Sequence, residues 1–354
     1  MDEILSNLAN KIAEISNKRK ALANAIDKGI KIKHKIDDID LGNLKICGID
    51  GGFLKKDYHG ARLILRRAVA ACFNFTNGKL ESCEYLPNSR PFPEAIIVNP
   101  EYSDQEFNVL SNLKREEIEL EMALEAIEKF RPDIIIRDGS IILHPSSAIL
   151  ATSSIYKTYA NVTELFKQLY SECERRNILL VGAIEDSKGQ RYCNYLNKKI
   201  IPEVLNSNSD QKVIIAGNMK ILDNTTDSLF LYYLLDINER TESITYTDLH
   251  LPDFESWNNK LFVTYIKPVD YDRPLRLDFI SKPENLNETT KKITEIVCKI
   301  SKHNRNYSYP SVLIEADARA KLTDVEIEHF KSALAEKLGN NPTLMELRRE
   351  GRPL

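Results

Sequence analysis

Two short apolar runs that each end in Asp-Gly constrain the fold of this chain more than any other feature. The first is Ile46–Phe53, where Asp50 precedes two glycines, and the second is Asp133–Ser140, where Asp138 precedes one. Each pattern predicts a buried strand whose carboxylate emerges where the backbone must turn. A lone Asp-Gly pair is typical of a turn, so a functional interpretation depends on the two strands being neighbours.

The two aspartates form a metal site if these strands lie side by side in one sheet. Asp50 and Asp138 then meet at the same edge. Two adjacent carboxylates repel each other, and a divalent cation is the usual remedy. We therefore predict a metal centre built on this pair.

Composition excludes several other classes of protein. The 354 residues suit one large or two ordinary domains, and the net charge of -3 excludes a uniformly basic nucleic-acid coat while leaving room for a local basic groove. The six cysteines contain no CxxC pair, which predicts reduced core residues in a cytoplasmic protein. No apolar run reaches the roughly 20 residues of a membrane span, and the start of the chain lacks the apolar core of a signal peptide.

The N-terminal residues predict a helix over 3–26 with a narrow apolar stripe. Such a stripe suits docking on the protein's own body or pairing with a second subunit, and both interpretations stay open. The basic segment Lys28–Lys35 predicts a solvated linker, with a contact to phosphate as the alternative. We expect residues 1–40 to form this helix and linker, 41–340 to form a single domain, and 341–354 to form a tail.

The next segments predict an antiparallel meander, because Asn77-Gly78 is a strong hairpin turn. Beyond residue 150, helices alternate with strands, which indicates a mixed α/β sheet flanked by helices. The predicted strands are 46–53, 62–75, 80–86, the run with Asp138 within 133–140, 178–184, 213–216, 243–248, 261–267 and 275–280. The predicted helices are 105–130, 159–176, 190–206, 224–236 and 287–303, with a helical tail over 311–338.

The helix over 105–130 brings a further acid towards the sheet. At 100° per residue Glu116 falls within its apolar face and Glu119 at the edge of that face. A carboxylate aimed at a core needs a cationic side chain or a metal as its partner. The remaining glutamates fall away from the face, as solvated charges do: Glu117, Glu121, Glu125 and Glu128.

The order of these features is that of the ribonuclease H-like fold: a strand with Asp, two hairpin strands, a helix with Glu, and a strand with Asp. In that fold the acids hold two divalent ions about 4 Å apart for phosphodiester hydrolysis. Hard oxygen ligands select Mg²⁺ or Mn²⁺.

Several motifs in this order resemble the NurA nucleases, partners of the hexameric translocase HerA, and they cover roughly residues 41–320. They are Gly48–Gly52, Arg137–Ser140, Gly182–Ser187, Asn238–Thr241, Arg276–Phe279, Tyr309-Pro310 and Leu313–Ala316. The resemblance implies a ribonuclease H-like core and Mn²⁺-dependent cleavage of DNA, with Mg²⁺ as the alternative and two ions per site. It also implies a homodimer that receives single- or double-stranded DNA from a HerA-type hexameric ATPase. The implied activity is a 5′ to 3′ exonuclease with single-strand endonuclease activity, acting in DNA end processing.

The resemblance also assigns site residues. By position, Asp50 and Asp138 match the two family aspartates, and Glu119 matches the helix glutamate because Ala123 follows it, with Glu116 as the fallback. Tyr309 matches a tyrosine near the family's active site.

Two positions depart from the family pattern. Asp317 stands where the family has a histidine, and an aspartate there would still bind metal. The family also tends to have a lysine at 185 or 186, and Lys188 and Arg191 are close enough to replace its contact with phosphate.

Basic residues that could line a DNA path include Arg66 and Arg67, which interrupt an apolar strand. We predict that these two bind DNA together with Lys188 and Arg191. The wider set of candidates adds Arg62, Arg137, Lys198 and Lys199.

Two other functions remain open. An actin-like or sugar-kinase-like ATPase opens with a similar Gly-Ile-Asp-Gly-Gly, but it needs further glycine-rich loops, and only Gly217, Gly339 and Gly351 follow residue 200. A catalytically weak or silent dimeric scaffold for the translocase is the second alternative. It fits the changes at 185–186 and 317 but not the intact Asp50 and Asp138.

Overall fold

The computed structural model describes residues 2–58, 62–98, 101–143, 153–207, 210–246, 252–337 and 339. The chain divides into two compact units. The first unit comprises Met1–Asp40 and Val181–Ser311, and the second comprises Leu41–Leu180 and Val312–Leu354. The predicted tail at 341–354 lies outside the described residues, and the single domain over 41–340 stays a prediction.

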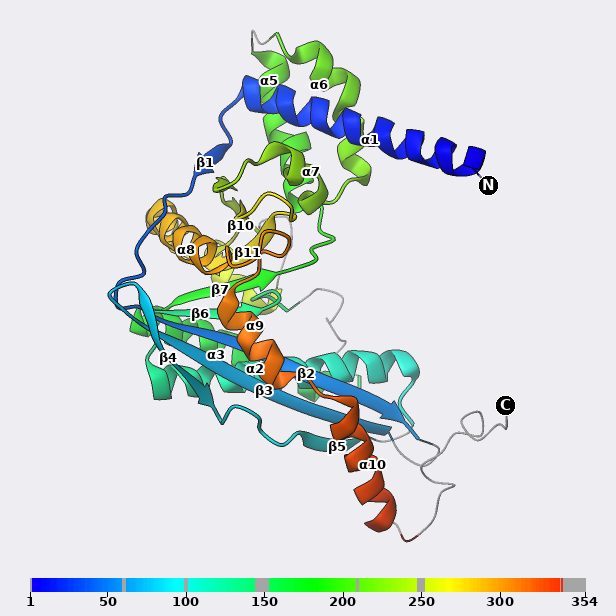
Figure 1. Ribbon diagram of the computed structural model, residues 1–354, viewed down its shortest axis with the longest axis vertical. Helices are drawn as coiled ribbons and strands as arrows, with labels where there is room; N and C mark the ends of the chain where they lie inside the picture. Colours follow the sequence, from blue (N-terminus) through cyan, green and yellow to red (C-terminus); the bar gives the residue numbers. More distant parts are fainter. Residues whose placement is uncertain are drawn as a thin grey trace. The chain divides into compact units, whose positions relative to one another are not determined.

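The second unit contains a mixed sheet in which the predicted meander is confirmed. Strands β2, β3 and β4 pair antiparallel in sequence order, β6 pairs parallel with β2, and β5 adds to β3. The bounds are β2 (Lys45–Asp57), β3 (Arg62–Thr76), β4 (Lys79–Leu86), β5 (Glu94–Val98) and β6 (Ile134–Asp138). The long β2 and β3 ribbons dominate the lower part of Figure 1.

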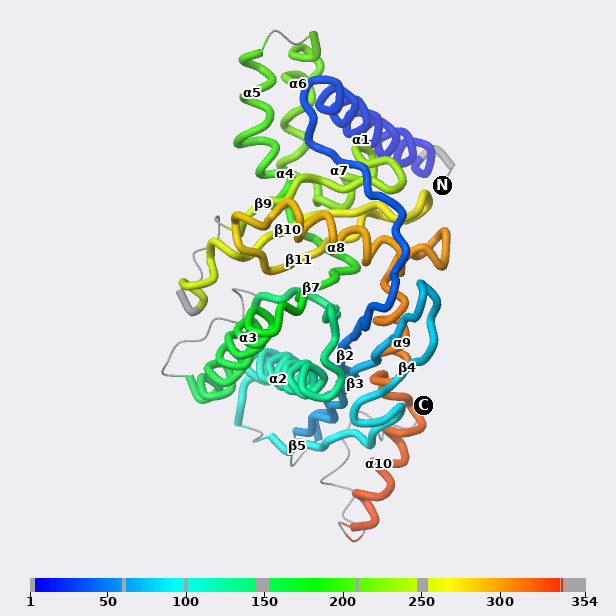
Figure 2. The backbone as a smooth tube through the Cα atoms, turned by 90° about the vertical axis from the view of Figure 1, so that its left-hand side faces the viewer, coloured from blue at the N-terminus to red at the C-terminus, as the bar shows by residue number. Residues whose placement is uncertain are grey.

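Helices cover both faces of this sheet. On one face lie α2 (Asp104–Phe130) and α3 (Tyr156–Arg176), and on the other lies α9 (Ser311–Ala320), which α10 (Asp324–Lys337) follows (Figure 2). Helix α2 begins with a capping box, in which Ser103 and Glu106 each accept a backbone N–H of the other. Its apolar side is buried except at Leu124, which is partly exposed, as the 3.6-residue period predicts.

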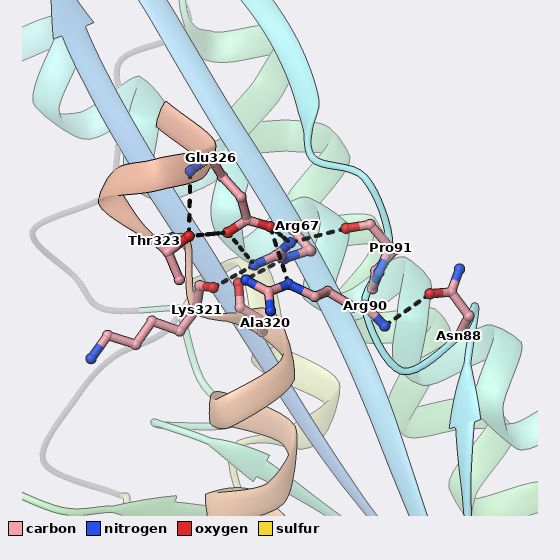
Figure 3. Close-up of polar contacts among 8 residues, drawn as sticks. All are labelled: Arg67, Asn88, Arg90, Pro91, Ala320, Lys321, Thr323 and Glu326. Atoms are coloured by element: carbon pink, nitrogen blue, oxygen red, sulfur yellow. Dashed lines mark hydrogen bonds and ion pairs between the residues drawn. The ribbon is translucent and has the colours of Figure 1, made fainter. Parts of the chain in front are cut away.

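A buried arginine on β3 fastens the C-terminal helices to the sheet (Figure 3). The Arg67 guanidinium donates to the carbonyl oxygens of Ala320 and Pro91, each at 3.0 Å, and to that of Lys321. It also forms an ion pair of 2.8 Å with Glu326 of α10. One side chain therefore satisfies carbonyls at the end of α9 and orients the start of α10.

The first unit contains an antiparallel sheet with strand order β1, β8, β10, β11 and β7, with β9 paired to β10. Its strands are β1 (Lys33–Lys35), β7 (Leu179–Ile184, of which the last four residues belong here), β8 (Glu239–Thr241), β9 (Ile244–Thr245), β10 (Leu261–Lys267) and β11 (Leu275–Ile280). Its α-helices are α1 (Asp2–Gly29), α4 (Arg191–Tyr195), α5 (Ile201–Asn206), α6 (Lys212–Asn218), α7 (Asp227–Leu234) and α8 (Leu286–Ile300). A π-helical segment, Leu196–Ile200, joins α4 to α5, and short 3₁₀ helices span Met219–Asn224, Pro252–Trp257 and Pro283–Asn285.

One predicted strand is wrong. Residues 213–216 lie within the helix α6, where Ile215 is buried while Val213 and Ile214 are exposed. A run of four apolar residues has no period long enough to separate a strand from a helix. The short strands β1, β5 and β8 fall in segments where no strand was expected.

The N-terminal helix is confirmed, and its apolar stripe has two different environments. Leu22 and Ile26 near its C-terminal end are buried where α1 packs on α6 and α7. Ile4, Leu8 and Ile12 near its start are exposed. Among the described residues, no helix has the length and apolar character required to cross a membrane.

The Arg67 tether predicts an acid-sensitive contribution to stability. Its ion pair with Arg67 is the largest of the contacts that hold the pKa of Glu326 well below the ordinary 4.5. A depressed carboxyl pKa stabilises the fold above the unfolded-state pKa, and the stabilisation is lost as pH falls. We expect Glu326→Gln to lower the melting temperature at pH 7 by an amount worth about 1 kcal/mol, and the difference from wild type to shrink as pH falls below about 4.5.

The control is Glu328→Gln, which changes an exposed glutamate on the same helix. Thermal unfolding of all three proteins between pH 3 and 8 makes the comparison. An equal loss for the two variants at every pH would show that the Arg67–Glu326 pair does not stabilise the fold.

Candidate metal centre

The parallel pairing of β2 with β6 brings the two predicted aspartates together. Ile49 lies opposite Arg137 in the register of these strands. The following residues are Asp50 and Asp138, and residues in register on parallel strands point to the same face. The predicted adjacency of the two strands is therefore confirmed, and Asp50 is buried. The turn expected directly after Asp50 is wrong, because β2 continues in pairing with β3 as far as Asp57.

Two glycines on β2 allow α9 to approach the strand backbone closely. A Cβ atom on Gly48 would lie 2.6 Å from the carbonyl oxygen of Val312, and one on Gly52 would overlap the carbonyl oxygen of Ala320. These contacts involve both ends of α9. No side chain larger than hydrogen fits at either position without moving the helix.

The close approach of α9 to β2 determines the position of Asp317, the fourth predicted acid. Gly48, Asp50 and Gly52 share one face of β2 because side chains alternate along a strand. Asp317 lies on α9 between the two contact points, and its charge contributes to the electrostatic environment of Asp50. A hydrogen bond of 2.6 Å from the Tyr85 hydroxyl on β4 to Glu315 adds a further tether to α9.

The third acid reaches the centre from α2. Glu119 has 0% exposure, and its Oε1 atom would lie 2.6 Å from a Cβ on Gly51. Its Oε2 atom accepts a hydrogen bond of 2.5 Å from Arg137, while Oε1 has no hydrogen-bond donor and lies 3.6 Å from Arg115 Nε. The missing side chain at position 51 therefore lets a carboxylate of α2 lie next to Asp50.

The four acids are coupled electrostatically. Burial, followed by the negative charges of Asp138 and Glu119, raises the pKa of Asp50 to about 8, and the charge of Asp317 adds to the shift. The backbone N–H of Gly51 opposes it by donating to Asp50 Oδ1 at 2.7 Å. Concentrated negative charge with too few cations is the electrostatic condition that a bound metal relieves.

Glu116 is the less favourable helix acid. It contacts Arg137, and its side chain is partly exposed. Its neighbour Glu117 was expected to be solvated, and that expectation is wrong, because it is buried and pairs with Arg66 at 2.7 Å.

The residues fit a divalent cation in their chemistry. Carboxylate oxygens are the ligands that Mg²⁺ and Mn²⁺ prefer, and Glu119 Oε1 is a buried acceptor without a donor. Among the described residues, no three acidic, histidine or cysteine side chains are already arranged closely enough to hold one ion. Loading therefore requires side-chain movement.

The arginines predicted to bind DNA are engaged inside the second unit. Arg66 is buried between Glu94, Glu117 and the carbonyl of Lys114, at 2.9, 2.7 and 2.6 Å. Arg67 forms the tether described above. These two charges in an apolar strand are explained by ion pairs within the protein. A DNA contact for Arg66 and Arg67 stays a prediction, and their burial does not favour it.

The remaining predicted residues lie in the first unit. Lys188 is exposed on the loop after β7, and the Arg191 guanidinium stacks over the Tyr246 ring at 4.0 Å. Tyr309 is buried, and its hydroxyl donates to the carbonyl of Ala183 at 3.1 Å.

Sequence reasoning missed the part played by Arg137 and Arg115. Arg137 was considered only as a DNA-lining residue, yet it is fully buried and holds both helix glutamates. A charged residue directly before Asp138 inside an apolar run was the available signal, because such a charge needs a buried partner.

A mixed sheet flanked by helices, with carboxylates side by side on two adjacent strands and on two packed helices, defines the ribonuclease H-like class of proteins. The predicted fold class is therefore confirmed. The NurA domain matches residues 44–322 of this chain. Since that match spans most of the sequence, the chain belongs to the NurA family.

The chain is also similar to solved structures. The crystal structure of the NurA nuclease from Sulfolobus solfataricus is similar with a TM-score of 0.59 and 16% identity, covering 96% of this chain and 97% of that one. A NurA structure with manganese has a TM-score of 0.45 and 12% identity, covering 97% and 100% of the two chains. A NurA structure bound to dAMP and manganese has the same TM-score and identity, covering 98% and 99%. No curated protein sequence matches the chain.

Removal of the Asp50 charge should stabilise the metal-free protein. A carboxyl whose pKa is raised from 3.8 to about 8 keeps a proton in the folded state that the unfolded state releases, so stability falls as pH rises between these values. We expect Asp50→Asn to unfold at a higher temperature than wild type at pH 8 and at the same temperature near pH 4. Added Mn²⁺ should stabilise wild type and not the variant.

Differential scanning fluorimetry with and without Mn²⁺ measures this, with Glu125→Gln, an exposed glutamate of α2, as the control. An equal Mn²⁺ shift in wild type and Asp50→Asn would remove Asp50 from the metal centre.

Gly52→Ala should displace α9, because the added methyl group overlaps the Ala320 carbonyl. Overpacking of this kind costs about 1–3 kcal/mol. We expect a lower melting temperature and weaker Mn²⁺ binding in calorimetry, because Asp317 moves with the helix. Gly217→Ala on α6 is the matched control, since its Cβ meets no atom within 4 Å. Full Mn²⁺ affinity in a folded Gly52→Ala protein would contradict the positioning of Asp317 by this contact.

Proposed function

We propose that this protein is a divalent-metal-dependent deoxyribonuclease that hydrolyses phosphodiester bonds. The observation that carries the proposal is the convergence of Asp50, Asp138, Glu119 and Asp317 from four elements of one unit. Burial and then the charges of the other three acids raise the pKa of Asp50. Membership in the NurA family supports the choice of reaction, since the Sulfolobus solfataricus member is a nuclease.

In this mechanism the chain supplies the ligands and their orientation. Asp50 and Asp138 would hold Mn²⁺ or Mg²⁺, with two ions per site, and Glu119 would contribute the Oε1 atom that no donor occupies. Such ions supply an activated water, orient the scissile phosphate and stabilise the leaving oxygen. Arg137 holds the other oxygen of Glu119 and so sets its orientation. Asp317 completes the acidic edge from α9.

The same carboxylates would repel a DNA strand in the absence of metal. Metal binding therefore converts an edge that rejects phosphate into one that accepts it. Lys188, exposed on the loop after β7, is the basic residue we assign to a DNA phosphate. Arg191 is assigned to the same path.

The finer parts of the proposal follow the family. We assign a 5′ to 3′ exonuclease with single-strand endonuclease activity, acting on DNA ends in the cytoplasm as a homodimer with a HerA-type hexameric ATPase. Tyr309 is assigned near the reacting phosphate, and its hydroxyl donates to the carbonyl of Ala183 in the structure.

One observation favours a second function. Glu119 is already paired with Arg137, so the acids are not preassembled around an ion. A catalytically weak scaffold that serves the translocase fits this pairing. Membership in the NurA family argues against the actin-like or sugar-kinase-like ATPase.

The test is digestion of end-labelled single- and double-stranded DNA with Mn²⁺, Mg²⁺ or EDTA. We expect metal-dependent cleavage that Asp50→Asn and Asp138→Asn each reduce by at least about a hundredfold, because a metal-holding carboxylate supplies several kcal/mol to the transition state. The position of the label gives the polarity.

Glu125→Gln serves as the control variant and should cleave at the wild-type rate. If no metal supports cleavage, the assay is repeated with the hexameric ATPase. Absence of cleavage in both conditions would reject the nuclease and leave the scaffold.

A further inference from the structure

The first unit contains a cavity of about 490 Å³ that the proposed nuclease function does not use. It lies between the end of α1, β1, β8 and α8, of which α1, β1 and α8 are labelled in Figure 1. Its size falls within the roughly 300–1,000 Å³ of small-ligand sites. The lining residues are Asp27, Lys31, Lys33, His34, Lys35, Ile36, Asp37, Glu239, Arg240, Lys291, Thr294 and Glu295.

Three of the lysines in this cavity are offset by acids. Lys33 contacts Asp27 and Glu239 at 3.1 and 3.2 Å, and Lys35 contacts Glu239 at 2.9 Å. On the other side of the cavity, Lys291 pairs with Asp37 at 3.0 Å. These pairs form the walls and leave those lysines with little free charge for a ligand.

A second group of basic residues has no carboxylate hydrogen-bond partner in the part of the chain that the structure describes. His34 lies directly opposite Arg240 in the pairing of β1 with β8. Arg240 donates to the carbonyl of Thr241 at 3.0 Å, which leaves most of the donors of its guanidinium fork unused. Burial, followed by the charges of Arg240 and Lys31, lowers the pKa of His34, so the three side chains share one electrostatic environment.

The same cavity also holds an unused acceptor. Glu295 is only 9% exposed, and its Oε1 atom has no hydrogen-bond donor, with the Lys291 ammonium 3.6 Å away. A buried carboxylate oxygen without a donor costs free energy unless a ligand or water supplies one. The cavity thus offers cationic donors and, beside them, one acceptor.

We propose that this cavity binds a nucleotide phosphate, with the phosphate on Arg240, Lys31 and His34 and a sugar hydroxyl or base N–H on Glu295. An arginine fork matches two phosphate oxygens at once. A nucleotide carries both an anion and hydrogen-bond donors, which is the combination that the lining requires, whereas a simple anion would leave Glu295 unsatisfied. The ligand is either a segment of a DNA strand or a free mononucleotide, which share this chemistry.

The test measures binding to the full chain in EDTA, where metal-dependent cleavage cannot occur. Calorimetry with inorganic phosphate and with dAMP, and fluorescence anisotropy with a short single-stranded oligonucleotide, form the three arms. We expect dAMP to bind more tightly than phosphate. For each ligand that the wild-type protein binds, Arg240→Ala should lower the affinity by about tenfold or more, since it removes a charged, bidentate partner.

Glu295→Gln should not lower the affinity for inorganic phosphate, in contrast to Arg240→Ala. It removes a negative charge from the cavity while keeping its shape, so inorganic phosphate should bind equally or more tightly. Arg305→Ala, an exposed arginine of the same unit outside the cavity, should bind as wild type does. Competition between dAMP and the oligonucleotide identifies the DNA strand as a source, and binding of dAMP alone identifies the free nucleotide.

Two results would overturn the proposal. One is no binding by wild type in any arm at 10 mM phosphate or dAMP or at micromolar oligonucleotide, and the other is wild-type affinity in a folded Arg240→Ala protein. If Arg240→Ala unfolds, Lys31→Ala replaces it, because Lys31 is exposed and its removal leaves the core intact. Wild-type affinity in that variant rejects the site. Because no arm needs cleavage, these outcomes are independent of the nuclease assay.

Discussion

The register between β2 and β6 is the constraint on which the candidate centre depends. Parallel pairing with Ile49 opposite Arg137 sets Asp50 and Asp138 side by side, and a shift of one residue would turn one of them to the other face. The same register sends Arg137 towards α2, where it meets Glu116 and Glu119. The pairing of β2 with β6 therefore places Asp50 and Asp138 on one face of the sheet and Arg137 on the other.

Close contacts with the backbone of β2 bring the other two acids to this pair. Glycines at 48 and 52 admit α9, and the glycine at 51 admits the carboxylate of Glu119 from the opposite helix. Arg67 then fixes the end of α9 through carbonyls that a helix terminus would otherwise leave unsatisfied. The acids thus converge because three glycines of β2 leave room for α9 on one face and for Glu119 on the other, and side chains at these positions would hold the helices apart.

The sequence predicted the parts of this arrangement that rest on local pattern. The two Asp-Gly strands, the hairpin and the long helices have clear periods or turn signals, and the structure contains them close to their predicted bounds. Short elements such as β1 and α6 lacked such signals. The partners of Arg66 and Arg137 could not be predicted either. An arginine in an apolar strand indicates a buried or a ligand-facing charge equally well until the tertiary contacts are known.

The chain order of the second unit has a consequence for synthesis. That unit combines residues 41–180 with residues that follow 311, so its sheet is made first and its last helices only after the whole first unit. On the ribosome, Asp50, Glu119 and Asp138 emerge long before Asp317. They also emerge before α9, the helix that packs against Gly48 and Gly52 and whose end accepts hydrogen bonds from Arg67. A nascent or truncated chain that stops before residue 312 lacks the fourth acid, so the complete acidic centre exists only after synthesis has passed the whole first unit.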